Sequence, residues 1–351
     1  LAGSDGRVDR EAAMAAATRA TDSINELALA FSLEAITGLF CGGQQEGVIE
    51  RGRIAEMKPV HRARLVQRLV RALAEKGSLE ETEAGWRVPV GGKALQKRSA
   101  ATLLGELRSD EAGIEGMRAE LELVARCGEG LCSVLSGENT NPLELLFPSD
   151  SSKASVANTY SDSAGSTFLN VLVGRTVSEL VAGIRERGRK DIRVLEVGAG
   201  TGGTTKAVLE QLAAGRREGE RLEYVYTDIS ASFFAKAKRR FPKGEYGTIE
   251  YRALDIERDV EEQGFSAHTY DVVVAANVLH ATRDMAATLR NVRRRLAPAG
   301  ALVALEVVVH DVWLDVVFGL LEGWWLFAEA DTELRPDGPT MPADAWARAL
   351  A

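Results

Sequence analysis

The stretch RVLEVGAGTGGTTK, residues 193–206, decides how the rest of the chain is interpreted. It opens with a short apolar run typical of a buried parallel strand, made of Val194, Leu195 and Val197. Four glycines follow before a helical pattern resumes near Thr204: Gly198, Gly200, Gly202 and Gly203. Glycines permit positive φ angles and let a ligand lie against bare backbone, while the first turn of a helix offers free N–H groups. The stretch therefore predicts a ligand cradle.

The spacing of these glycines fits two kinds of cofactor. Gly198, Gly200 and Gly203 also satisfy the G-x-G-x-x-G pattern of dinucleotide enzymes, which is a weak signal alone. Glu196, at the end of the predicted strand, separates the two interpretations. A carboxylate would repel a pyrophosphate, but it would attract the ammonium and sulfonium groups of S-adenosylmethionine (SAM). The charge therefore favours SAM.

A second acidic residue follows the next predicted strand. The segment LEYVYTDIS, residues 222–230, has the pattern of a strand that ends on Asp228. A carboxylate at this position is suited to hold the two hydroxyls of a ribose. The alternative is a surface acid near a helix that begins at Ser230.

Composition and charge exclude several classes of protein. The 351 residues suffice for about two domains, and because the first residue is Leu1 rather than Met we expect a segment of a longer polypeptide. We see no signal peptide and no apolar run near the roughly 18 residues of a membrane span, so we expect a cytoplasmic protein without membrane contact. The net charge of −8 disfavours nucleic acid. Three cysteines without metal-ligand spacing predict reduced thiols and no metal site: Cys41, Cys127 and Cys132.

Residues 1–150 are predicted to form a mainly helical domain. Helical patterns cover Arg10–Phe40 and Val60–Glu75, and later 99–109 and 113–135. Residues 79–88 predict a small hairpin, which gives a winged-helix-like unit. Its three glutamates would be repelled by phosphate, which argues against DNA binding. This block is expected to be a lid over the cleft of the next domain, or a packing partner of it.

Residues 156–351 alternate strand and helix patterns, which predicts an α/β domain with a doubly wound, Rossmann-like parallel sheet. Five strands are expected, at 193–197, 224–227, 251–256, 271–276 and 302–309. Asp255 lies at the carboxyl end of the third, the edge at which such sheets bind ligands. The five strand ends are therefore expected to converge on one crevice.

Several motifs together resemble the SAM-dependent methyltransferase domains of modular polyketide synthases. They are LEVGAGTGGTT (195–205), Asp228, DIE (255–257), NVLHAT (277–282) and the EGWW segment that ends at Trp325. The resemblance implies SAM as cofactor, a substrate held as a thioester on an acyl carrier protein, neighbouring synthase domains, and N-terminal helices that form a lid. Class I methyltransferase sheets close with a C-terminal hairpin, but no apolar strand pair follows 302–309 before Ala351, so those strands are expected to be truncated or supplied from elsewhere.

The resemblance also implies roles for individual residues. Glu196 would face the methionine part of the cofactor, Asp228 the ribose and Asp255 the adenine. The full set implied to bind the cofactor is Glu196, Gly198, Gly200, Gly202, Asp228, Ile229, Asp255, Ile256 and Asn277. His280 would be the catalytic base and Glu306, in the fifth strand, its partner.

A His–Glu dyad also suits the chemistry of methyl transfer, which needs alignment and one base but no metal. From the residues alone, a histidine bound to loop carbonyls and a glutamate at a helix N-terminus fit equally well. The family motif favours the dyad of His280 and Glu306.

Aromatic residues after the fifth strand are predicted to lie on one helix: Trp313, Phe318, Trp324 and Trp325. Most such stripes belong to a core, although some of these rings are candidates, with Tyr160, for the wall of an acyl pocket. C-methylation of a β-ketoacyl chain is the favoured reaction, because the carbon between a ketone and a thioester is acidic. O-methylation of a β-hydroxyacyl chain is the close alternative, and a non-catalytic docking module is the remote one.

Overall fold

The computed structural model describes residues 10–42, 47–89, 98–138, 141–150, 155–156, 159, 163–242 and 244–351. The chain forms two compact units, each composed of two stretches of sequence. The first contains Leu1–Thr159 and Asp311–Trp325, and the second contains Tyr160–His310 and Leu326–Ala351. Residues 156–351 were expected to form one domain, but residues 311–325 belong to the first unit.

The first unit is organised around the long helix α1 (Arg10–Cys41), whose buried side includes Ile24, Leu27 and Ile36. Helices α3, α6 and α13 pack against it. The helices of this unit are α1, α2 (Arg51–Ala55), α3 (Val60–Glu75), α4 (Ala100–Ser109), α5 (Glu111–Ile114), η2 (Glu115–Met117), α6 (Arg118–Ser136), α7 (Pro142–Leu146) and α13 (Val312–Phe318). The helical character of this block was predicted.

A small antiparallel sheet completes the first unit. Strands β2 (Glu80–Glu81) and β3 (Gly85–Arg87) form the expected hairpin, and β1 (Val48–Glu50) pairs with the other edge of β3. A Cβ atom on Gly85 would lie 2.0 Å from the carbonyl oxygen of Ile49, so the close approach of β1 requires glycine there. The third strand was not predicted because, unlike the hairpin, it pairs with a partner that is distant in the sequence.

The segment 311–325 belongs to the first unit because its polar side chains are bound there. The buried carboxylate of Asp315 in α13 forms an ion pair with Arg68 (Nε–Oδ2 3.1 Å) and accepts a hydrogen bond from Trp324 Nε1 (3.1 Å). The prediction of one aromatic helix was wrong, because α13 ends at Phe318 and the 3₁₀ helix η5 (Glu322–Glu329) follows. A Cβ on Gly319, between them, would lie 2.9 Å from Leu65 Cδ1.

The second unit contains a five-stranded parallel sheet in the order β6-β5-β4-β7-β8. Its strands are β4 (Asp191–Val197), β5 (Arg221–Asp228), β6 (Thr248–Ala253), β7 (Tyr270–Ala276) and β8 (Leu296–Leu305). Its helices are α9 (Ala164–Glu186), α10 (Gly203–Ala214), η3 (Ala231–Phe233), α11 (Phe234–Arg240), η4 (Leu279–Ala281), α12 (Met285–Arg295) and α14 (Ala343–Leu350). The predicted doubly wound parallel sheet is confirmed.

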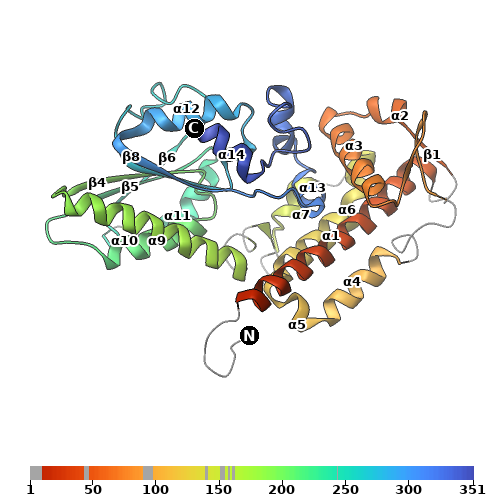
Figure 1. Ribbon diagram of the computed structural model, residues 1–351, viewed down its shortest axis with the longest axis horizontal. Helices are drawn as coiled ribbons and strands as arrows, with labels where there is room; N and C mark the ends of the chain where they lie inside the picture. Colours follow the sequence, from red (N-terminus) through yellow and green to blue (C-terminus); the bar gives the residue numbers. More distant parts are fainter. Residues whose placement is uncertain are drawn as a thin grey trace. The chain divides into compact units, whose positions relative to one another are not determined.

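Helices cover both faces of this sheet, as Figure 1 shows. On one face α9, α10 and α11 pack on the side chains of Ile192, Val194 and Tyr224. On the other face α12 and α14 pack on Val225 and Val273. Successive residues of a strand point to opposite faces, so strands covered on both sides are apolar along their length.

The last strand differs from its predicted range. Residues 298–300, which precede the predicted strand, lie inside β8 as an irregularity in its register with β7, where Ala299 has a φ of 63°. At its other end β8 stops at Leu305, so Glu306 follows the strand instead of lying within it. In the described part of the chain no strand follows β8. Helix α14 packs through Ala345 and Trp346 on the face of the sheet that α12 also covers.

Two helices are long and apolar enough to cross a membrane by length and composition alone, which differs from the expectation that no such run exists. They cover Met14–Cys41 and Gly165–Glu186. One or two such helices are weak evidence, since the core helices of globular proteins pass the same test. In α9 the buried residues Val173, Val177 and Val181 recur at helical spacing on the side that faces the sheet.

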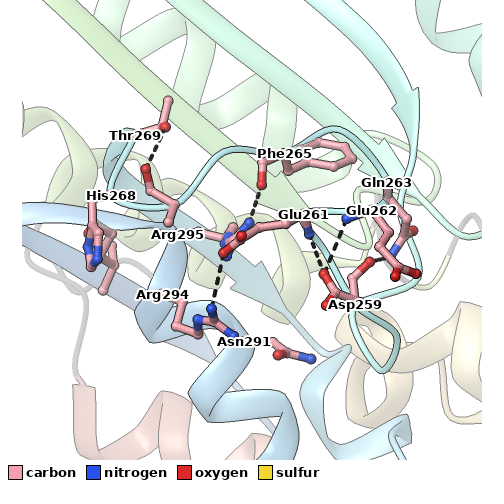
Figure 2. Close-up of polar contacts among 12 residues, drawn as sticks. Asp259, Glu261, Glu262, Gln263, Phe265, His268, Thr269, Asn291, Arg294 and Arg295 are labelled. Atoms are coloured by element: carbon pink, nitrogen blue, oxygen red, sulfur yellow. Dashed lines mark hydrogen bonds and ion pairs between the residues drawn. The ribbon is translucent and has the colours of Figure 1, made fainter.

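The connection between β6 and β7 is held at the amino-terminal ends of the strands, as Figure 2 shows. Arg295, the last residue of α12, is buried and donates hydrogen bonds to the carbonyl of Phe265 and to Glu261 Oε1 (2.9 Å). Asp259 accepts the backbone N–H groups of Glu261 (2.8 Å) and Glu262 (3.2 Å). This loop is therefore ordered by polar contacts instead of regular structure.

Candidate active site

The glycine segment between β4 and α10 forms the predicted cradle. Gly198, Gly200 and Gly202 have φ angles of 65°, 53° and 78°, which a residue with a side chain rarely adopts. A Cβ on Gly198 would lie 2.3 Å from Val278 Cγ2, so only glycine lets this loop approach the segment after β7. A Cβ on Gly200 would meet only the carbonyl oxygen of Gly198, at 3.9 Å, so the backbone at Gly200 is left open to a ligand.

Asp228 lies at the end of β5, beside the glycine loop. Its Oδ2 accepts the N–H of Gly200 (3.0 Å), and its Oδ1 accepts the N–H of Ser230 (2.8 Å). Burial raises the pKa of this carboxyl, and the two N–H groups oppose that shift. The neighbouring Ile229 is 71% exposed. Asp228 therefore joins the glycine loop after β4 to the end of β5.

Glu196 is buried beneath α10. Its Oε2 accepts hydrogen bonds from Thr205 Oγ1 (2.6 Å) and Tyr224 OH (2.7 Å). Its Oε1 is buried and has no hydrogen-bond partner within the described residues. Burial raises the pKa of this carboxyl to about 7, although the two hydroxyl donors lower it. A buried carboxylate oxygen without a partner is costly, and a cationic ligand group would relieve that cost.

Three further predicted residues follow β6 and β7. Asp255 Oδ1 accepts the N–H of Glu257 (3.0 Å), and its Oδ2 forms an ion pair with Arg258. Ile256 is buried in the core beneath the sheet. Asn277 has a φ of 51°, and its Oδ1 is buried without a hydrogen-bond partner in the described part of the chain. A strained residue with an unsatisfied polar atom at a strand end is typical of a functional site.

His280 and Glu306 meet at the ends of β7 and β8. His280 Nδ1 lies 2.5 Å from Glu306 Oε2, and both side chains are buried. Glu306 Oε1 also accepts the N–H groups of Val278 (3.1 Å) and Leu279 (2.8 Å). An ionised Glu306 accepts only, so Nδ1 carries the proton and Nε2 is the basic nitrogen. Glu306 therefore binds the imidazole and also the N–H groups at the start of η4, so both arrangements considered for it in the sequence are present.

Comparisons with known proteins agree with this geometry. Residues 195–302 match the family model of a methyltransferase domain. The chain is 40% identical over 209 residues to the non-reducing polyketide synthase nvfA of Aspergillus novofumigatus. The aligned region covers 60% of this chain and 9% of nvfA. The CurJ carbon methyltransferase structure is 35% identical, with a TM-score of 0.80, over 96% of this chain and 85% of that one. The chain belongs to the methyltransferase domains of polyketide synthases.

A further solved relative bears on the cofactor of this methyltransferase. The trans-methyltransferase CalH, in complex with SAH, is 31% identical with a TM-score of 0.65, over 95% of this chain and 84% of that chain. The protein is a SAM-dependent methyltransferase, as predicted. Its own residues fit that cofactor, because open space lies over Gly200 and the unpartnered oxygens of Glu196 and Asn277 can accept from its polar groups.

The predicted aromatic wall of this methyltransferase lies in the first unit. Trp324 and Trp325 are buried there, and Trp325 Nε1 donates to the carbonyl of Gly319 (2.9 Å). Trp313 and Phe318 are half-buried in α13, and the rings of Phe318 and Trp324 stack at 5.4 Å. Tyr160 lies outside the described residues. A role for these rings in an acyl pocket stays a prediction.

Some residues of the site were missed by sequence reasoning. Tyr224 and Tyr226 alternate along β5, and their hydroxyls reach Glu196 Oε2 and the carbonyl of Gly200 (2.5 Å). The period-two spacing of these two tyrosines was the available signal. Arg335, which contacts the turn that carries His280, had no signal, because it lies 55 residues away in an irregular segment. Within the described residues, no group of three or more metal-binding side chains is present.

Proposed function

We propose that this methyltransferase transfers a methyl group to the α-carbon of a β-ketoacyl thioester carried by an acyl carrier protein, beside the other domains of a polyketide synthase. Two relatives support the proposal: CurJ is named a carbon methyltransferase, and nvfA is named a polyketide synthase. This chain spans about a tenth of nvfA, so the partner domains are part of the proposal.

The observation that carries the proposal is the 2.5 Å contact between His280 Nδ1 and Glu306 Oε2. Glu306 holds the imidazole in one tautomer and orientation, because it also binds the backbone of Val278 and Leu279. The contact stabilises the imidazolium that forms when Nε2 takes up a proton.

Apart from this base, the proposed reaction needs few other groups from the protein. SAM supplies a methyl group that its sulfonium already activates. His280 Nε2 removes a proton from the carbon between the ketone and the thioester. That carbon then forms a bond to the methyl group as the bond from the methyl group to the sulfonium sulfur breaks, so S-adenosylhomocysteine would be the leaving group. Asp228, the glycine loop and Glu196 are proposed to hold the cofactor, with Asp228 at the ribose and Glu196 toward the ammonium group. Asp255 is proposed to lie at the adenine. Orienting the two reactants and removing one proton are sufficient for this reaction class.

The test compares two matched probes, an acetoacetyl carrier protein and a 3-hydroxybutyryl carrier protein. We expect intact-protein mass spectrometry to show methylation of the ketoacyl probe in the presence of SAM. His280→Ala is expected to lower its rate at least about 100-fold and to leave SAM affinity, measured by calorimetry, unchanged. His268→Ala is the matched control, since His268 lies in the loop before β7, at the opposite strand end.

Asp228→Ala tests the cofactor assignment separately and is expected to weaken SAM binding. Methylation of the hydroxyacyl probe alone would assign O-methylation instead. A protein that binds SAM but methylates neither probe would support a docking module, and a fully active His280→Ala variant would exclude the dyad.

A further inference from the structure

Arg335 is buried beside the turn that carries His280. None of its side chain is exposed. Its Nη1 donates to the carbonyl oxygen of His280 (2.9 Å), and its Nη2 donates to the carbonyl of Arg283 (2.8 Å) and to Asp331 Oδ2 (2.6 Å). One guanidinium therefore joins both ends of a four-residue turn to a carboxylate.

Asp331 extends the same set of contacts to the next helix. Its Oδ2 also accepts the N–H of Met285, the first residue of α12 (2.9 Å). On the other side of the turn, Glu257 Oε1 accepts the N–H of Arg283 (2.6 Å). The backbone from His280 to Met285 is thus bound by side chains from two distant segments of the second unit.

We propose that Arg335, anchored by Asp331, is a positioning residue that fixes the main chain of His280 so that its imidazole keeps the orientation in which Glu306 holds it. This inference rests on the proposed role of His280 as base. Glu306 binds the backbone before the imidazole, at Val278 and Leu279, and Arg335 binds it at His280 and after. Without Arg335, the carbonyl groups of His280 and Arg283 lose their donors, and the side-chain contacts that remain after His280 are those of Glu257 and Asp331 to the N–H groups of Arg283 and Met285.

The geometry of the contact explains why arginine is required. The planar guanidinium presents several donors in a rigid fork, which reaches two carbonyls and a carboxylate at once. A lysine in its place carries a compact charge on a flexible stem and cannot reproduce that spacing. Small displacements of a reacting group can reduce rate by about 100-fold, so a loosened turn is expected to lower turnover before it lowers cofactor affinity.

The contact also involves a segment that follows a passage of the chain through the first unit. After β8 the chain passes through the first unit at 311–325 and returns to the second at Leu326. Arg335 and Asp331 lie on that returning segment, close after its re-entry, and the ring of Phe327 lies 5.5 Å from the guanidinium. The turn with His280 is thus completed by residues that reach it only after the chain has left and re-entered the unit.

The experiment compares Arg335→Lys with Arg295→Lys in the full chain. Arg295 is a matched control, because it is also buried and also binds a carbonyl and a carboxylate, but at the opposite end of the sheet (Figure 2). Turnover of the acetoacetyl carrier protein, SAM affinity and the melting temperature are measured for both. The sequence has four histidines, so ¹⁵N-histidine NMR reports the His280 ring directly, with Glu306→Gln assigning its signal.

We expect Arg335→Lys to lower kcat about 10- to 100-fold with SAM affinity retained, and to shift or broaden the His280 signal. Arg295→Lys is expected to leave kcat and that signal unchanged. Asp331→Asn, which keeps the fork but weakens its anchor, should give a smaller change of the same kind and covers the case in which Arg335→Lys does not fold.

Equal kcat and an unchanged His280 signal in Arg335→Lys, with a melting temperature that falls as in Arg295→Lys, would overturn the inference. If His280→Ala is inactive but Arg335→Lys is fully active, only this inference fails. If His280→Ala is fully active, the proposed function fails first.

Discussion

The carboxylates that lie directly at the two ends of the parallel sheet have different partners, although a buried ion pair, Arg335 with Asp331, also supports the turn that carries His280. At the amino-terminal ends, buried charges form ion pairs: Arg185 with Glu220 (2.8 Å), Arg189 with Asp271 (2.5 Å) and Arg295 with Glu261 (2.9 Å). At the carboxyl ends, Glu196, Asp228 and Glu306 are bound by hydroxyl, N–H and imidazole groups. In the described part of the chain, no lysine or arginine forms an ion pair with these three carboxylates.

We expect the ion pairs at the amino-terminal ends to serve stability, and the three carboxylates at the carboxyl ends to serve function. Paired charges at one end hold loops and helices in place, with their charge neutralised locally. Carboxylates held by neutral donors have no fixed cation beside them, so in their ionised form they attract a cofactor with ammonium and sulfonium groups. Variants at the amino-terminal end should therefore change stability alone, and variants at the carboxyl end should also change cofactor binding or turnover.

The largest expected effect is at the amino-terminal end. Arg185 and Glu220 are almost fully buried and form a two-pronged ion pair. Arg185→Met leaves the Glu220 carboxylate buried without a cation, so the free energy of unfolding should fall by about 3–5 kcal/mol in urea titrations. The rate per folded molecule should not change.

The double variant Arg185→Met/Glu220→Leu is the control for this prediction. Since it removes both charges, it should recover most of the lost stability. A fall in turnover without a loss of stability would break the distinction between the two ends.

Glu196→Gln tests the carboxyl end. Burial raises the pKa of Glu196 in the folded state from 4.5 to about 7, so its ionisation opposes folding. The stability that it contributes is present below pH 4.5 and lost as the pH rises through 7. Glutamine cannot ionise, so without SAM the variant should be more stable than the wild type by up to about 3 kcal/mol above pH 7, and the difference should vanish below pH 4.5.

The same variant should bind SAM more weakly above pH 7, as calorimetry at several pH values can show, because the proposed contact with the ammonium group is lost. Thr205→Val, which removes one donor to Glu196 but keeps its charge, is the matched control. A variant with wild-type SAM affinity at every pH would contradict the assignment of Glu196 to the cofactor.

The smallest effect is expected at an exposed pair on the amino-terminal side. Arg221 and Asp191 form an ion pair at 2.6 Å, but their side chains are 83% and 60% exposed. Arg221→Ala should change the free energy of unfolding by less than about 1 kcal/mol, and raising the salt concentration should reduce even that. A loss as large as that of Arg185→Met would show that burial is not what distinguishes these pairs.

Much of the fold was predictable because it follows local patterns. The strand-and-helix alternation after residue 160 indicates a parallel sheet, since such connections place strands side by side. Glycines 198, 200 and 202 were predictable too, because their positive φ angles are a requirement of the residue type. Boundaries were less certain, as β8 shows: its irregularity at Ala299 is decided by pairing with β7 and not by the Pro-Ala-Gly sequence.

The support around the site was less predictable. The order of the strands brings Glu306 and His280 to the same edge of the sheet, but only the family motif favoured their pairing over the alternative contacts. Arg335 could not be assigned, because no periodicity links it to a turn 55 residues earlier. The place of 311–325 in the first unit was not predicted for the same reason, since Asp315 is bound by Arg68, which is 247 residues away.

The sequence alone determined the local features of the chain. These are the segments that become strands, the glycine positions at which the chain turns, and the acidic residues at or near the ends of strands. Tertiary structure decided which of these groups are buried, paired or left without a partner. Glu196 is an example, since its position at a strand end is visible in the sequence but its unpartnered Oε1 is not. Burial and hydrogen bonding depend on distant parts of the chain, and they set the charge at the cofactor edge and the position of His280.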